Sequence, residues 1–206
     1  MTMKLFEPAD RSCVVVGSLN PGIIQPGWLA KHGIASPEAE WELGLEFGAP
    51  TPAFSDDHFH WSCKHNRLVV SSVVDKKSDP GEMVARVLEI LSHTPITAIG
   101  NNIAYTVTSE NLQQLLAPLA EPGIVEELGE EPSTYSSTIT LSRNEAVLNM
   151  KFDGSGSSVG AVAFNYHRPC APGTGSASAV ASARRWSDDE RDSRSFMERL
   201  AGLLQV

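Results

Sequence analysis

The fold of this chain depends on the stretch Cys13-Val14-Val15-Val16-Gly17, in which four apolar residues, three of them β-branched, end at a glycine. Such a run is typical of a central strand that is covered by other elements. A second run, from Ile96 to Gly100, begins the second half of the sequence. After each run come a helical pattern, a group of strands and an amphipathic helix, so we predict that one order of elements occurs twice.

The first half continues with a short helix at 26–33, where proline stands at the start and glycine at the end. Residues 58–63 alternate between polar and apolar, which predicts a half-buried strand, and 68–73 form its partner in a hairpin. Asp79 is expected to cap a helix that ends near residue 91. Residues 36–57 fit an edge strand, a helix over 38–45 or a loop, and we favour a loop with some extended structure.

The second half is expected to contain a strand that bends near residue 100, a helix capped by Ser109, and a three-stranded meander. The predicted meander strands are 138–142, 146–152 and 159–166. Residues 169–183 are rich in Ala, Ser, Gly and Pro, which predicts a linker or mobile loop. Ser187 and Glu190 have capping-box spacing for a last amphipathic helix.

These patterns together predict an α+β fold. We expect two pseudo-symmetric strand-helix-strands-helix halves, 1–94 and 95–206, that share a mainly antiparallel sheet with the helices packed on one face. The stretch 169–186 is expected to be flexible. Each half alone has a sheet with one apolar face and one long helix to cover it, so the two halves should form one compact unit.

Composition limits the possible functions. The chain has 206 residues and a formal net charge of -9, which opposes binding to a phosphate backbone. Three widely spaced cysteines do not resemble a secreted disulfide framework. Neither a signal-peptide pattern nor an apolar run of about 18 residues is present. We therefore expect a cytoplasmic protein with neither nucleic acid nor a membrane as partner.

Four potential metal ligands, His58, His60, Cys63 and His65, lie within eight residues. Strand alternation places His58 and His60 on one face and Cys63 on the other, so the four cannot converge on one ion without breaking the strand. The histidines remain the only metal candidates, and we expect neither a metal nor another cofactor.

No local motif indicates catalysis. Cys13 and Cys63 are expected to be buried, and Cys170 is expected to be exposed in flexible sequence that would position a nucleophile poorly. The glycine-rich stretches at 154–157 and 173–175 carry no lysine and are expected to be turns or linkers. We therefore predict no catalytic residue.

The segment Leu91-Ser92-His93-Thr94-Pro95-Ile96-Thr97-Ala98-Ile99-Gly100-Asn101-Asn102, together with Asn20-Pro21 and Phe164-Asn165-Tyr166-His167, resembles a sporadically distributed group of uncharacterised bacterial proteins. The resemblance implies a bacterial accessory protein and carries over no functional residue.

Two roles remain ahead of an enzyme, which ranks third. The first is a non-enzymatic interaction or assembly subunit that pairs through exposed edge strands with itself or with another protein chain. The alternative is a small-molecule sensor whose pocket lies between the two halves. The candidate pocket residues are Trp28, Trp61, Tyr105 and Tyr166.

Overall fold

The computed structural model describes residues 6–46, 49–73, 78–108, 134–143, 145–155, 159–171 and 176–204. Its elements, in chain order, are β1 (Phe6–Gly17), α1 (Pro26–Lys31), β2 (Glu40–Glu46), β3 (Ala49–Ser55), β4 (Phe59–Lys64), β5 (Arg67–Ser72), α2 (Pro80–Ile90), β6 (Ile96–Thr108), β7 (Thr134–Arg143), β8 (Ala146–Ser155), β9 (Val159–Pro169), α5 (Ala177–Arg184) and α6 (Trp186–Leu204). The helix predicted to begin at Ser109 lies outside the described residues.

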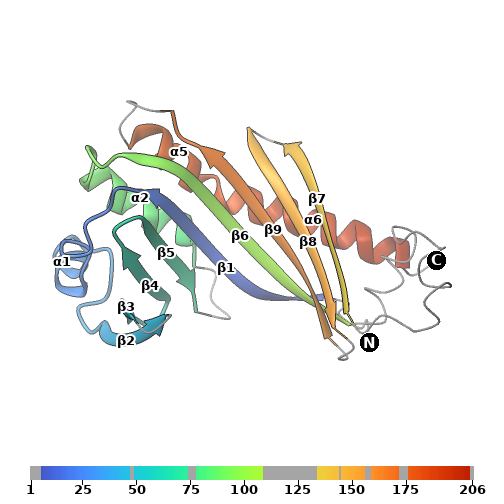
Figure 1. Cartoon of the computed structure of the whole chain (residues 1–206), viewed down its shortest axis with the longest axis horizontal. Coiled ribbons are helices and arrows are strands. Elements are labelled where there is room, and N and C mark those ends of the chain that lie inside the picture. The colour runs from blue at the N-terminus through green and yellow to red at the C-terminus, as the bar shows by residue number, and fades with distance from the viewer. Residues whose placement is uncertain are drawn as a thin grey trace.

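All nine strands belong to one sheet, in the order β2-β3-β4-β5-β1-β6-β9-β8-β7, and every neighbouring pair is antiparallel (Figure 1). The two apolar runs that open the halves lie in β1 and β6, which pair at the centre from Phe6↔Val107 to Gly17↔Ile96. The chain therefore has an α+β fold in which both halves contribute to a single antiparallel sheet.

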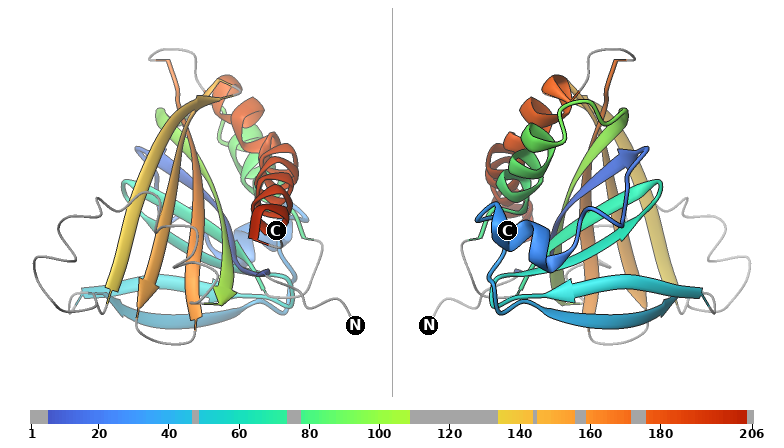
Figure 2. Two further views of the ribbon diagram at one scale, coloured as in Figure 1. Left: turned by 90° about the vertical axis from the view of Figure 1, so that its right-hand side faces the viewer. Right: turned by 90° about the vertical axis from the view of Figure 1, so that its left-hand side faces the viewer.

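The helices α2, α5 and α6 lie on the same face of this sheet (Figure 2). Alternate residues of β6 point at them, and Ile99, Ile103 and Tyr105 are fully buried there. Burial of each such side chain contributes roughly 1.5–3 kcal/mol. α2 starts as expected: the Asp79 side chain accepts a hydrogen bond from the Glu82 backbone N–H, 3.0 Å away. The core thus lies between one face of the sheet and these helices.

One sequence prediction of extended structure needs correction. Residues 36–57, for which we favoured a loop with some extended structure, contain the β2–β3 hairpin at the edge of the sheet. The strand expected to bend near residue 100 is β6, which continues through that point and is paired on both sides. Gly100 lies where a side chain would fit tightly, because a Cβ there would lie 3.3 Å from the Asn165 amide nitrogen.

The stretch predicted to be flexible, 169–186, is also corrected. Most of its described part is the helix α5, which packs against α2 and β6. Ala179 and Ala183 are fully buried, so the small residues permit close helix contact. Residues 172–175 lie outside the described part of the chain. The predicted capping box at Ser187 is wrong as well, because α6 already begins at Trp186 and the Ser187 hydroxyl bonds Asp79.

A glycine in the first turn of α2 makes the helix junction possible. A Cβ added to Gly81 would lie 2.2 Å from the Ala183 carbonyl oxygen and 2.4 Å from the Trp186 Cβ. Any larger residue would push α2 away from the point where α5 leads into α6. Within the described residues, no helix combines the length and apolar character needed to cross a membrane.

Candidate functional site

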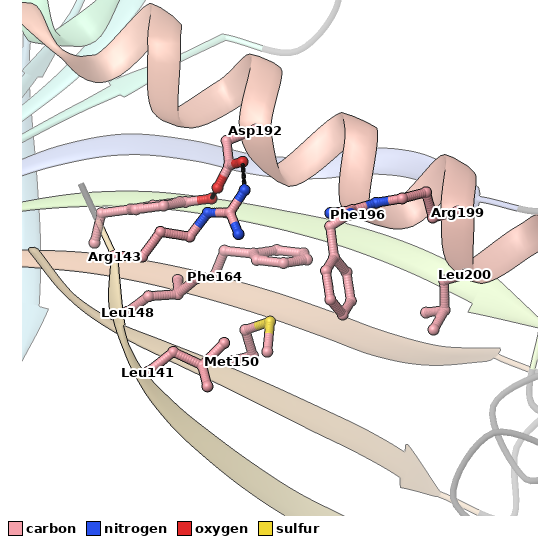
Figure 3. Close-up of a pocket in the computed structure, with 10 residues that line it drawn as sticks. Leu141, Arg143, Leu148, Met150, Phe164, Asp192, Phe196, Arg199 and Leu200 are labelled. Atoms are coloured by element: carbon pink, nitrogen blue, oxygen red, sulfur yellow. Dashed lines mark hydrogen bonds and ion pairs between the residues drawn. The ribbon is translucent and has the colours of Figure 1, made fainter.

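A groove runs between α6 and the helix-covered face of β7, β8 and β9 (Figure 3). It has a volume of about 370 Å³, which is within the range of sites that hold small ligands. The described residues that line it are Leu141, Arg143, Leu148, Met150, Phe164, Tyr166, Asp192, Phe196, Arg199 and Leu200. Six of these residues are apolar, so the groove is a mainly apolar site with polar groups on one side.

The two walls of the groove follow from the periodicity of the sequence. On α6, Asp192, Phe196, Arg199 and Leu200 are spaced four, three and one residues apart, which places them on one face of a helix. On the sheet, the lining residues are cross-strand neighbours on one face, such as Leu141 opposite Leu148. The groove lies entirely in the second half of the chain and not between the halves, where the alternative role placed a pocket.

At one end of the groove two polar side chains, Arg143 and Tyr166, bond to Asp192, and Figure 3 shows the pair of Arg143 and Asp192. Arg143 donates to one carboxylate oxygen at 2.5 Å, and the Tyr166 hydroxyl donates to the other at 2.9 Å. Burial and the Asp192 carboxylate raise the pKa of Tyr166, whereas the bond to Asp192 raises the pKa of Arg143. Tyr166 therefore keeps its proton, and the guanidinium keeps its charge.

The described lining residues offer groups that suit the binding of a ligand. Among the described lining residues there is neither thiol nor imidazole, and a tyrosine with a raised pKa is a poor nucleophile. What the groove offers is an apolar surface beside hydrogen-bond donors. Of the predicted pocket residues, Tyr166 lines it, whereas Trp61 and Tyr105 are fully buried in the core and Trp28 belongs to α1.

The cysteines are all unpaired and buried. Burial raises the pKa of the Cys13 thiol, raises that of Cys63 to about 11 and raises that of Cys170. The expectation that Cys170 is exposed is wrong, because its side chain is 7% exposed and its backbone N–H bonds the Thr97 carbonyl. None of these thiols is activated for nucleophilic attack.

The candidate metal ligands lie apart from the groove. His58 and His65 are exposed, and His60 hydrogen-bonds Ser55 through its Nδ1. Cys63 is buried on the opposite face of β4, as the alternation predicted. Among the described residues, no group of three His, Cys, Asp or Glu side chains is placed to hold a metal ion.

A buried polar cluster anchors α6 to the sheet near the groove. Arg168 on β9 donates to both carboxylate oxygens of Asp189, at 2.6 and 2.7 Å, and the Asn101 amide donates to the same carboxylate at 2.8 Å. Arg168 and Asp189 are 3% and 1% exposed. From the sequence we predicted only a capping box for this helix and did not find the pair. The alternation of β9, which places Arg168 on the apolar face, could have indicated a buried partner.

The strand β7 lies at one edge of the sheet, and within the described residues it pairs only with β8. Its ten residues contain no proline and a single charged residue, Arg143, at the last position. Leu141 is 41% exposed on it. The strand at the other edge, β2, contains Glu40, Glu42 and Glu46 in its sequence. The two edges therefore differ in how well they discourage pairing with another strand.

No protein-family model and no curated protein sequence matches the chain.

Proposed function

We propose that this chain is a non-enzymatic assembly subunit of a bacterial complex and that it pairs through its edge strand β7 with a second copy of itself. The observation that supports this proposal is the sequence of this edge strand, whose ten residues contain neither proline nor an internal charge and which, within the described residues, pairs only with β8. Natural edge strands are usually short, charged, bulged or covered, because unpaired backbone groups attract other strands. At about 3.4 Å per residue, β7 offers roughly 34 Å of edge.

A second copy fits this edge because the strand is self-complementary. The described side chains of β7 alternate in face: the helix-free face carries hydroxyl residues, and the helix-covered face carries Ser137, Ile139, Leu141 and Arg143. Antiparallel pairing of two β7 strands about a twofold axis would place like faces together and cover Leu141 in both copies. The two sheets would then continue into one another.

The net negative charge of the chain should make this dimerisation depend on salt concentration. Each copy carries a net charge of -9, so two copies repel one another at low ionic strength. Screening shortens the reach of that repulsion from about 30 Å at 0.01 M salt to about 10 Å at 0.1 M. Dimerisation is therefore expected to strengthen as salt is raised, which is opposite to the behaviour of an interface held by ion pairs.

The test is a charge placed in the middle of the edge. Thr138 is exposed and lies opposite Lys151 in the neighbouring strand, so Thr138→Glu gains an attractive neighbour within one copy. Across the twofold axis it brings two carboxylates close together, which should weaken the dimer by about fivefold or more. The matched control is Ala181→Glu, which adds the same charge at an exposed position of α5.

Mass in solution, measured by light scattering over a range of protein and salt concentrations, distinguishes the outcomes. We expect dimers for the parent chain and for Ala181→Glu, and monomers for Thr138→Glu at the same concentration. A parent chain that stays monomeric at every concentration contradicts the proposal. So does a Thr138→Glu variant that dimerises as strongly as the control.

The proposal extends to the symmetry between the two halves of the chain. We infer that the halves are related by an approximate twofold axis between β1 and β6. The strand orders β1-β5-β4-β3 and β6-β9-β8-β7 support this relation, since in each half the first strand lies beside the last.

Three unpaired, buried thiols favour the reducing cytoplasm as the place where the protein acts.

A further inference from the structure

The groove beside α6 has an excess of positive charge on a strongly acidic chain. Its described lining contains two guanidinium groups, Arg143 and Arg199, and one carboxylate, Asp192, which leaves one positive charge. The whole chain has a net charge of -9. A local positive charge next to apolar residues favours a ligand that is itself apolar and carries a single negative charge.

Arg199 supplies the charge that is not cancelled. In the described part of the chain, its Nε donates to the Ser195 backbone carbonyl at 3.4 Å, and its guanidinium lies 5.9 Å from the centre of the Phe196 ring. Neither contact neutralises it. Figure 3 shows Arg199 extending along α6 toward the Arg143–Asp192 pair. Arg143 is bonded to Asp192 through one nitrogen, and its side chain is 42% exposed, so other donors of the fork face outward.

We propose that this groove binds an unbranched, medium-chain monocarboxylate. The tail would lie on the apolar residues Leu148, Met150 and Phe164 beneath Phe196, and the carboxylate would lie between Arg143 and Arg199. A volume of about 370 Å³ equals that of roughly a dozen waters, which suits a single short chain. The Asp192 carboxylate beside the two arginines repels a second negative charge, so a monoanion is preferred over a phosphate dianion.

This inference is independent of strand pairing at β7. Leu141 and Arg143 are shared by the groove and the edge strand, but Arg199 and Leu200 lie on α6. Substitutions at these two helix positions therefore test the ligand without changing the edge strand.

The experiment is calorimetric titration of the full chain with decanoate, kept below the concentration at which the ligand self-associates. We expect one site per chain. Shortening the ligand to octanoate and hexanoate should weaken binding by about fourfold for each methylene lost. Arg199→Gln should weaken decanoate binding by about two- to fivefold and leave binding of decanol unchanged. Leu200→Trp should fill the groove and abolish binding of both.

The matched control is Arg191→Gln, which removes a guanidinium from the same helix at a position that is 78% exposed and outside the groove. It should bind decanoate like the parent chain. The proposal is overturned if decanoate shows no saturable binding. It is also overturned if decanol binds the parent chain as tightly as decanoate, or if Arg191→Gln and Arg199→Gln weaken binding equally.

Discussion

Removal of the Arg168 guanidinium should be among the most damaging single changes to this fold. The side chain is 3% exposed and forms a two-pronged pair with Asp189, which is 1% exposed. Arg168→Met keeps a long apolar stem but leaves the Asp189 carboxylate in the interior. Among the described side chains, the Asn101 amide at 2.8 Å would remain as its hydrogen-bond donor. A buried charge that loses its counter-charge is strongly destabilising.

The loss of stability expected for Arg168→Met can be estimated from the burial of the Arg168–Asp189 pair. Breaking a buried ion pair by removing one partner costs about 3–5 kcal/mol. For a chain of this length, each kcal/mol lowers the melting temperature by about 2–4 °C. Arg168→Met should therefore lower the melting temperature by roughly 6–20 °C and shift the urea midpoint downward. Replacing both partners, as Arg168→Met with Asp189→Leu, should recover at least half of this loss, because no isolated charge remains.

The assay is urea unfolding followed by tryptophan fluorescence and circular dichroism, with the single and double variants analysed as a cycle. Arg191→Met is the matched control, because its pair with Asp188 is exposed on both sides and should leave the midpoint unchanged. The reasoning is refuted if Arg168→Met behaves like that control. It is equally refuted if the double variant is no more stable than the single one.

Two further predictions concern stability. Gly81→Ala should destabilise the chain by about 1–3 kcal/mol, because the new methyl group would overlap α5 and α6. Gly202→Ala is the matched control: its methyl group meets nothing within 4 Å, so it should stabilise the chain by up to about 1 kcal/mol. The urea midpoints of the two variants measure both effects. Burial raises the pKa of Cys63 to about 11, and the pKa values of Cys13 and Tyr166 are also raised. The stability that these neutral groups contribute is complete below a pH of about 8.5 and is lost as the pH rises toward 11. The urea midpoint should therefore fall over that range, and Cys63→Ala should make its fall with pH less steep. A urea midpoint that does not change with pH would contradict this.

The strands and α2 were predictable from sequence because their signals are local. The buried face of β4, with Phe59, Trp61 and Cys63, follows directly from period-two alternation and is confirmed. The meander strands are confirmed and extend further than predicted. A hairpin or a meander has its partners close in sequence, so turn residues and alternation suffice to predict it.

Elements whose stability depends on distant contacts were missed. α5 contains mostly Ala and Ser, which give a weak periodic signal, and it is held by close contact with α2, about 100 residues earlier, as in the pair Arg184–Glu82. The groove needs β7, β8, β9 and α6 together, and the Arg168–Asp189 pair joins a strand to a helix. A single sequence contains these residues but not their proximity.

The pairing of β1 with β6 affects the chain while it is still being synthesised. The Thr97 hydroxyl bonds the Val16 carbonyl across this pair, 81 residues away. At translation rates of about 5–20 residues per second, the ribosome needs roughly 4–16 s to make that interval. For that time the edge of the nascent β1 that later pairs with β6 has no strand beside it, and its unpaired backbone groups, next to the apolar run Cys13–Val16, can be captured by neighbouring nascent chains.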